Sequence, residues 1–375
     1  MNWAILELYC GNSGKLGYYN SQELGLARAL AQKGINVSII YPINRQKRMD
    51  IQEIEERIVI LRVPSFNLGV HSFYNLKFLL ERKIEVVQLN SDNQIYAPMV
   101  MKFCQKNGIL LYNYVGTVYS DSKNAIKKQI MKLISIRNLR YYRKSIVLAK
   151  TNAVKKSLGD KRVDNVQIVP VGLDITNINT ECSAKKDLKK ELGIPENKKV
   201  LLFVGRLEHY KRPFAALELL NRLGQDYCLV VIGSGNLKME FCAKIQSDFK
   251  SGRVFYYERI PNSEMYRFYR ICDYFVNFNI QEIFGMSILE AMYQKCIVIA
   301  RRAPGPNEII ENGISGFLCD NDEQMVNIIK NRNENQIGEH AMERVVKCFT
   351  WNESADKILQ IVNDRLRYKK AVLKV

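Results

Sequence analysis

The chain has 375 residues, of which 47% are apolar and 25% are charged, and its formal net charge is +18. This length exceeds what one ordinary hydrophobic core can organise, so it predicts a soluble globular protein of two domains. No stretch approaches the roughly 18 consecutive apolar residues that a membrane span needs.

The N-terminus and the cysteines indicate in which cellular compartment the protein is expected. Residues 1–10 carry no basic lead and include Glu7, so they predict a first strand rather than a signal peptide. The nine cysteines form no C-x-x-C pair, and the three histidines lie far from any cysteine cluster. We therefore expect free thiols, no structural zinc site and a cytoplasmic location.

The positive charge is concentrated in the first half of the chain. Residues 1–170 hold 26 Lys and Arg against 12 Asp and Glu, whereas the remaining residues hold 30 against 26. This asymmetry predicts that the first half meets something anionic, such as nucleic acid, phospholipid head groups or a phosphorylated substrate.

Short apolar runs alternate with amphipathic helical stretches, which is typical of parallel α/β architecture. The first half is expected to contain a helix at 23–33 and strands at 4–9, 37–41, 58–63, 86–89, 110–114, 145–149 and 166–169. The second half is expected to contain strands at 200–204, 229–232, 254–257, 274–278, 297–300 and 316–318, with a last helix at 354–368.

These elements predict two Rossmann-like domains, at 1–171 and 199–350, facing each other across a cleft. The polar segment 172–198 is expected to be the linker between them. Residues 351–375 are expected to form a C-terminal helix that packs back on the first domain. Ligands bind at the carboxyl ends of the strands in such sheets, so we expect the site there.

Eleven residues from Glu282 onward, Glu-Ile-Phe-Gly-Met-Ser-Ile-Leu-Glu-Ala-Met, carry the clearest chemical signal. They follow a predicted buried strand and open a helix. The free N–H groups of Gly285, Met286 and Ser287 at the helix N-terminus are suited to a diphosphate. Glu290, one turn further on, is placed to accept hydrogen bonds from ribose hydroxyls. The alternative is a loop acid followed by a solvated helix acid.

This stretch resembles the E-x7-E motif of the retaining GT-B glycosyltransferases, in particular family 4, the glycosyl transferases group 1. The segments 272–276 before it and 306–318 after it are similar as well. Gly205-Arg206-Leu207 with Lys211 beyond it matches the family's Gly-Arg-Leu…Lys element. The resemblance covers 165–320 densely and the first 40 residues loosely.

The resemblance implies a role for each matching residue. Arg206 and Lys211 would neutralise the nucleotide diphosphate as the glycosidic bond breaks, and Glu282 would contact the donor sugar or balance its positive transition state. Glu290 would hold the ribose, and Arg259 aligns with the place where the nucleobase is read. The other expected donor-binding residues are Gly205, Phe284, Gly285, Met286 and Ser287.

The glycine-rich loop 11–17 lacks the Gly-Lys-Ser/Thr ending of a Walker loop. It resembles the family's loop after the first strand, in which Gly14 and Gly17 are the expected donor-binding glycines. The alternative is a plain strand–helix turn.

The first domain departs from the family pattern, because many members have a histidine at the end of the fourth or fifth strand. The comparable stretch here, 110–117, has none. Asn113, Tyr114 or Thr117 could offer a polar group instead.

Further departures fall in the second half of the chain. Glu258, Asn279 and Lys295 stand where the family more often has Gly, Ser and Gly, which indicates a divergent donor pocket. Asp320 and Asp322 spell D-x-D in a predicted turn, where we expect solvated side chains rather than a metal site.

A basic helix is predicted within residues 121–150, which contain nine Lys and Arg and a single acid. It is suited either to lie on anionic lipid, each cation contributing on the order of 1 kcal/mol, or to pack its apolar stripe on its own domain. We expect both, with a peripheral position at the inner face of a membrane. No nucleic-acid-binding motif is present, so nucleic acid is not expected as a partner.

The expected protein is therefore a metal-independent, retaining hexosyltransferase without a cofactor. It would move a sugar from a nucleotide diphosphate sugar, most commonly UDP-linked, to a glycan or lipid-linked acceptor in polysaccharide synthesis. The second domain would bind the donor and the first the acceptor. A sugar-nucleotide epimerase of the same architecture and a non-catalytic, nucleotide-sugar-binding partner subunit remain alternatives.

Overall fold

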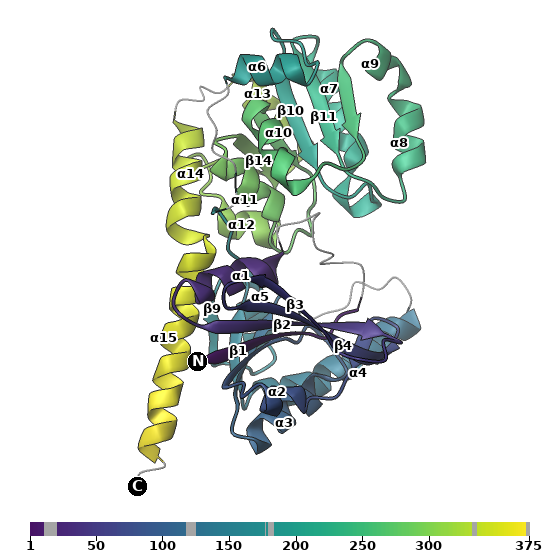
Figure 1. Ribbon diagram of the computed structural model, residues 1–375. Coiled ribbons are helices and arrows are strands. Elements are labelled where there is room, and N and C mark those ends of the chain that lie inside the picture. Colours follow the sequence, from purple (N-terminus) through teal and green to yellow (C-terminus); the bar gives the residue numbers. More distant parts are fainter. Residues whose placement is uncertain (11–20, 118–124, 177, 179–183, 332–335, 373–375) are drawn as a thin grey trace. The chain divides into compact units, whose positions relative to one another are not determined.

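The computed structural model describes residues 1–10, 21–117, 125–176, 178, 184–331 and 336–372 (Figure 1). The chain divides into two compact units. The first unit runs to Gly172 and takes up the chain again from Trp351, and the second extends from Leu173 to Thr350. Gly14 and Gly17, the expected glycines of the first loop, lie outside the described residues.

The first unit is built on a twisted, mainly parallel sheet in the order β3-β4-β2-β1-β6-β7-β8-β9, with β5 antiparallel to β4. Only β3 and β5 run antiparallel to their neighbour among the strands described. The strands are β1 Asn2–Glu7, β2 Asn36–Asn44, β3 Asp50–Glu55, β4 Ile58–Leu68, β5 His71–Phe73, β6 Val86–Asn90, β7 Leu110–Val115, β8 Ile146–Ala149 and β9 Val166–Ile168.

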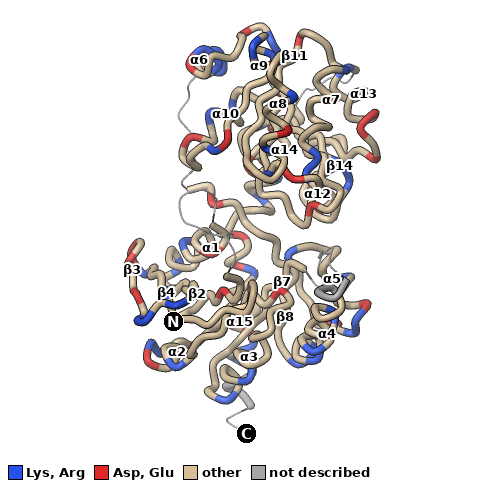
Figure 2. Tube along the Cα trace, turned by 90° about the vertical axis from the view of Figure 1, so that its right-hand side faces the viewer, with Lys and Arg blue, Asp and Glu red and all other residues tan. Residues whose placement is uncertain are grey.

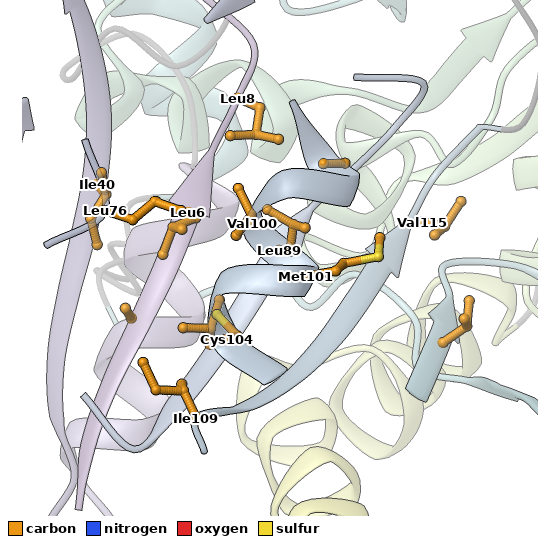
Figure 3. Close-up of a cluster of buried hydrophobic side chains, with 14 of the residues drawn as sticks. Leu6, Leu8, Ile40, Leu76, Leu89, Val100, Met101, Cys104, Ile109 and Val115 are labelled. Carbon is orange, nitrogen blue, oxygen red and sulfur yellow. The ribbon is translucent and has the colours of Figure 1, made fainter. Parts of the chain in front are cut away.

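Helices cover this sheet and close its core. They are α1 Gln22–Ala31, α2 Phe78–Glu81, α3 Ala97–Lys106, α4 Ala125–Tyr142, α5 Asn152–Gly159 and α15 Trp351–Val372. Side chains of β1, β6 and α3 interlock in the buried cluster of Figure 3, where Leu6, Leu89 and Val100 are fully buried. Val115, at the end of β7, belongs to the same cluster.

The C-terminal helix α15 belongs to the first unit and lies against α1 (Figure 1). Trp351 packs so closely on Gly25 of α1 that a Cβ there would lie 2.3 Å from the indole ring. Ser354 donates a hydrogen bond to the Pro170 carbonyl, and Lys33 pairs with Asp356. The helix is therefore anchored by packing, a buried hydrogen bond and an ion pair.

The second unit is a parallel sheet in the order β12-β11-β10-β13-β14-β15, the pattern of a Rossmann-like domain. Its strands are β10 Lys199–Val204, β11 Tyr227–Ile232, β12 Val254–Tyr257, β13 Tyr274–Asn277, β14 Ile297–Arg301 and β15 Phe317–Cys319. Its helices are α6 Lys185–Glu191, α7 Pro213–Leu223, α8 Lys238–Lys244, α9 Gln246–Lys250, α10 Met265–Ile271, α11 Met286–Tyr293, α12 Pro304–Ile309, α13 Asp322–Asn331 and α14 Ile337–Cys348, with 3-10 turns η1 His209–Lys211 and η2 Asn262–Glu264.

The expected linker 172–198 differs from the structure in its second half. Residues 185–191 form α6, which packs on α10 of the second unit. Lys185 bonds to Asp273 there, and Asp273 in turn accepts a hydrogen bond from the backbone of Val200. The helix is thus part of the second unit, because its basic side chains complete a polar contact at the start of β10.

Free thiols are observed for every cysteine in the described ranges, as expected. Among the same residues, no helix is both long enough and apolar enough to span a bilayer.

Candidate functional site

The site is built around an ion pair between η1 and the loop after β13. The Lys211 ammonium lies 2.5 Å from a Glu282 carboxylate oxygen, and these side chains are only 19% and 14% exposed. Asn279 donates a second hydrogen bond of 3.1 Å to the same oxygen. The sequence motifs that contribute these residues are 71 positions apart, and the fold brings them together.

Helix α11 begins at Met286, four residues after Glu282, and its N-cap Gly285 lies beside that side chain. Gly285, the N-cap, has a φ of +104°, a conformation that strongly favours glycine. A Cβ at Gly285 would lie 2.9 Å from Ile288 Cδ1 and 3.4 Å from Glu282 Cγ. Within the described ranges, the N–H groups of Gly285, Met286 and Ser287 donate to no protein acceptor. This N-terminus therefore offers amides and a positive dipole end to an anion.

Arg206 and Lys211 flank one aromatic ring. Tyr210 lies with its ring centroid 5.5 Å from the Arg206 guanidinium and 5.7 Å from the Lys211 ammonium. Burial raises the pKa of Tyr210, and the nearby Glu282 adds to this rise, against the opposing charge of Arg206. Arg206 itself is exposed. The two cations predicted to meet the diphosphate thus belong to one cluster with Glu282.

Glu290 lies on α11, and its carboxylate accepts a hydrogen bond of 2.6 Å from the buried Tyr269 hydroxyl. Burial and the Glu290 carboxylate raise the pKa of Tyr269, so the phenol stays protonated and donates. Nothing in the sequence motif indicated Tyr269, because it comes from α10, 21 residues before Glu290. The bond fixes one oxygen of the carboxylate that is expected to hold the ribose.

The remaining predicted donor-binding residues of the second unit differ in burial, as Phe284 and Arg259 show. The Phe284 ring is buried and packs edge-to-face on Phe349, so it contributes packing rather than a ligand-facing surface. Arg259 is exposed after β12. Its neighbour Glu258 accepts hydrogen bonds from Lys238 and Ser234, which lower its pKa.

Gly205 directly follows β10, where two loops pack closely against each other. A Cβ on Gly233, after β11, would lie only 1.9 Å from the Gly205 carbonyl oxygen. A Cβ on Gly235 would lie 2.5 Å from the Leu207 oxygen. The sequence stretch Gly-Ser-Gly after β11 is therefore required so that the backbone carrying Arg206 can lie against it.

In the first unit, the residues proposed in place of a histidine occupy three different settings. Asn113 is buried and donates to Ser145, which is a structural contact. Tyr114 is buried, and its hydroxyl has no partner among the described residues. The backbone N–H of Thr117 donates to Asp92. Val115, next to Tyr114, is buried in the core and offers no polar group.

Sequence reasoning missed a second polar cluster, at the end of β1. Asn90 donates a hydrogen bond to the partly buried Glu7 carboxylate. Burial, and next the neighbouring Glu23, raise the pKa of Glu7, against the opposing charge of Lys150. The ammonium of Lys150 also lies 5.0 Å from the ring centroid of Tyr114. Only the position of Glu7 at a strand end could have suggested this cluster.

The expectation of solvated side chains for the D-x-D holds for Asp320, which is 63% exposed, but is wrong for Asp322, which is 29% exposed and begins α13. Asp322 accepts hydrogen bonds from Arg212 and Arg301, and Asp320 pairs with Arg302. Two arginines therefore surround the Asp322 carboxylate. Among the described residues, no group of three or more His, Cys, Asp and Glu side chains is arranged to hold a metal ion.

Known proteins are similar to this chain in sequence. Residues 184–347 match the family described as "Glycosyl transferases group 1". The D-inositol 3-phosphate glycosyltransferase of Corynebacterium jeikeium is 29% identical over 53% of this chain and 52% of its own length, so the match spans about half of that relative. The enzyme of the same name from Corynebacterium diphtheriae is 27% identical over 94% of this chain and 91% of its own.

Solved structures share the fold of the whole chain. Sucrose-phosphate synthase from Thermosynechococcus elongatus has a TM-score of 0.78 at 16% identity, covering 98% of this chain and 99% of its own. Anabaena HepE in complex with UDP and glucose has a TM-score of 0.70 at 16% identity, covering 97% of this chain and 100% of its own. The resemblance seen in the sequence thus agrees with the family match over residues 184–347, and the chain has the GT-B fold of two Rossmann-like domains.

Proposed function

We propose that the protein is a retaining glycosyltransferase that uses a UDP-linked sugar as donor. Its acceptor is a glycan or a lipid-linked glycan of cell-surface polysaccharide synthesis. The observation that carries this proposal is the Lys211–Glu282 ion pair beside the N-terminal amides of α11, which donate to no acceptor in the described part of the chain. Two relatives named as glycosyltransferases and the UDP-and-glucose complex of Anabaena HepE support the nucleotide-sugar donor.

The chemistry follows from charge. The bond between the anomeric carbon and the phosphate oxygen breaks, and its electron pair leaves with the diphosphate. Lys211, Arg206 and the amides of α11 stabilise that charge, which is the task a metal ion performs in other transferases. The acceptor oxygen attacks the anomeric carbon on the same face, and its proton passes to the leaving phosphate. Glu282 balances the positive charge that develops on the sugar.

Helix α4 supports a membrane-bound acceptor, because three of its apolar side chains are exposed while its opposite side, with Leu139 and Tyr142, packs in the core of its own unit. Ile130, Leu133 and Ile136 are 52%, 69% and 45% exposed. On the opposite side, Ser135 and Asn138 are buried and hydrogen bond to the segment after β6. The alternative in which the apolar stripe packs inward therefore does not hold for these three residues.

The exposed face of α4 also carries positive charge. Lys132 and Arg140 are exposed beside the apolar side chains, and Figure 2 marks the Lys and Arg positions of the helix in blue. Apolar side chains flanked by cations suit the interface of an anionic bilayer. We therefore place the protein at the cytoplasmic face of the membrane, with α4 of the first unit in contact with lipid and that unit binding the acceptor.

Vesicle sedimentation tests the membrane contact. The wild-type chain is expected to sediment with vesicles of phosphatidylglycerol and to remain in solution with phosphatidylcholine vesicles. Leu133→Ser is expected to weaken sedimentation, whereas Met99→Ser, an exposed apolar change on α3, serves as the matched control. Equal binding to both lipids would contradict the electrostatic part of the proposal.

An assay of sugar transfer tests the proposed glycosyltransferase activity. The purified protein is incubated with UDP-, GDP- and ADP-sugars, with and without a membrane extract as acceptor, in the presence of EDTA. Sugar transfer from the UDP-linked donor, with the anomeric configuration of the product determined by NMR, is the expected result. Isomerisation of the donor without an acceptor would establish the epimerase instead. Binding without consumption, relieved by a second protein, would establish the partner subunit.

A further inference from the structure

Arg212, the residue after Lys211, has a strained backbone. It joins η1 to α7 with φ +54° and ψ 53°, in the left-handed region. Non-glycine residues rarely adopt this conformation, and the following Pro213 drives its neighbour toward extended backbone as well. Such a conformation persists only where surrounding contacts impose it.

The surrounding contacts are made by the Arg212 guanidinium. It donates two parallel hydrogen bonds to Asp322, of 3.1 and 2.6 Å, in the bidentate geometry that orients an arginine most firmly. The Phe278 ring centroid lies 6.0 Å from the same guanidinium. Arg301 donates a further hydrogen bond of 2.5 Å to Asp322. Burial opposes ionisation of Asp322, but the hydrogen bonds from Arg212 and Arg301 outweigh it and lower its pKa.

The backbone of Arg212 also ends the turn that presents Lys211. The Lys211 N–H donates to the Glu208 carbonyl, and the Arg212 N–H donates to the His209 carbonyl. The Ala215 N–H then donates to the Arg212 carbonyl, which starts α7. A change of φ at Arg212 would therefore rotate the turn 209–211 relative to α7 and move Lys211 away from Glu282.

We propose that Arg212 and Asp322 are positioning residues, whose bidentate pair holds the strained turn so that Lys211 faces Glu282. The consequence for catalysis rests on the proposed function, because it assumes that Lys211 meets the donor diphosphate. The effect on the Lys211–Glu282 geometry does not depend on that assumption. Asp322, the second acid of the D-x-D, thus acts through Arg212.

Four variants distinguish the effect of losing the Arg212–Asp322 ion pair from the effect of the backbone strain at residue 212. Asp322→Asn removes the carboxylate charge with little change of shape, and Arg212→Ala removes the guanidinium while the backbone still needs a positive φ. Arg212→Gly removes the guanidinium too, but glycine adopts the observed φ without strain. Arg212→Lys keeps the positive charge but cannot make two parallel hydrogen bonds to Asp322. It replaces Asp322→Asn in the experiment if that variant fails to fold.

The first measurement is the acetylation rate of Lys211 in the full chain, followed by peptide mass spectrometry, with Lys238 of the same unit as internal reference. Acetylation is expected to be slow in the wild type, since Lys211 is paired and mostly buried. It is expected to rise several-fold in Asp322→Asn and Arg212→Ala, relative to the reference lysine. Arg212→Gly is expected to fall between these variants and the wild type.

The second measurement is steady-state transfer. Displacing a charge by about 1 Å can cost as much as a hundredfold in rate, so kcat is expected to fall by about tenfold to a hundredfold in Arg212→Ala, with a smaller change in KM. Glu323→Gln is the matched control. It removes the Arg222–Glu323 ion pair, which also joins α7 to α13 but lies away from Lys211, and is expected to leave kcat unchanged.

A double-mutant cycle gives the decisive comparison. Asp322→Asn is expected to have little further effect on Lys211 in the Arg212→Gly background, because the guanidinium that ties Asp322 to the turn 209–211 is already gone, although Arg301 still contacts Asp322. An equal effect in both backgrounds, or wild-type acetylation of Lys211 in Asp322→Asn, would overturn the proposal. If the wild type transfers no sugar from any donor, the proposed function fails, while the acetylation rates still decide whether Arg212 and Asp322 position Lys211.

Discussion

The Lys211 ammonium and the Glu282 carboxylate lie 2.5 Å apart, and each satisfies the other's charge in a largely buried setting. Under the proposed function, the donor diphosphate would compete with Glu282 for the Lys211 ammonium. The pair would hold the cation in place before the donor binds and would free the carboxylate for the sugar afterwards. Binding and turnover are thus expected to respond differently to loss of Glu282.

Glu282→Gln is expected to bind UDP at least as tightly as the wild type, because the competing charge is gone. Its kcat/KM for transfer is expected to fall by about 10²–10³-fold, since the positive charge of the transition state is no longer balanced. Calorimetry with UDP and turnover with the UDP-sugar measure the two effects. Weaker UDP binding in this variant would contradict the competition.

In Lys211→Gln, both UDP binding and turnover are expected to fall. UDP binding weakens because a cation is removed, and kcat/KM falls by about 10²–10³-fold because the leaving charge is less stabilised. Glu339→Gln, which removes the exposed Lys295–Glu339 pair of the same unit, is the control and is expected to bind and turn over like the wild type. Undiminished turnover in Lys211→Gln would remove this residue from the site.

Gly285→Ala is expected to disrupt the N-terminus of α11. The φ of +104° and the 2.9 Å approach to Ile288 both exclude a Cβ without a shift, at a cost of about 1–3 kcal/mol. The melting temperature is expected to fall, and the increase in melting temperature on adding UDP is expected to shrink. Gly159→Ala, where a Cβ meets open space, is the matched control and is expected to be neutral or slightly stabilising.

Tyr269→Phe tests the orientation of Glu290. Without the 2.6 Å hydrogen bond, the carboxylate is expected to be less fixed, so the KM for the donor rises several-fold while kcat changes little. Steady-state kinetics with the UDP-sugar measure both constants. A fall in kcat at unchanged KM would instead assign Tyr269 and Glu290 to the chemical step.

Much of the fold was predictable, because strands of a buried parallel sheet appear in the sequence as near-continuous apolar runs, here bounded by glycines and amphipathic helices. Each strand expected in the second unit is observed, at β10 to β15. The strands β3 and β5 were not predicted. Asp50–Glu55 is largely exposed and acidic, so it lacks the buried apolar face on which a strand prediction depends, and His71–Phe73 is too short to show a period.

The site residues were predictable where they belong to one contiguous sequence motif. They were not predictable where the tertiary fold brings together residues from distant parts of the chain. Glu282 and Gly285 belong to one motif, and the sequence places them correctly at a strand–helix junction. Tyr269, by contrast, reaches Glu290 from another helix, and the partners of Asp322 come from β14 and the turn before α7. Side-chain pairs of this kind depend on how helices pack, for which local sequence gives no signal.

Glu7 is expected to make the stability of the protein depend on pH. Its pKa is raised in the folded state, first by burial and then by Glu23, whereas in the unfolded chain it is near the usual value of about 4.3. A carboxyl group with a raised folded pKa contributes stability below its unfolded pKa and loses it as pH rises through the folded pKa. The wild type therefore loses this contribution above about pH 4.3.

Glu7→Gln keeps an oxygen that can accept the Asn90 hydrogen bond and cannot ionise. The variant is expected to melt at the same temperature as the wild type near pH 4 and at a higher temperature near neutral pH, in thermal unfolding measured across that range. Glu53→Gln, an exposed change on β3, is the control and is expected to show no such crossover. A Glu7→Gln difference that is constant with pH would mean that the Glu7 carboxyl titrates alike in the folded and unfolded chains. The cluster at the end of β1 would then hold an ionised carboxylate at every pH at which the protein works.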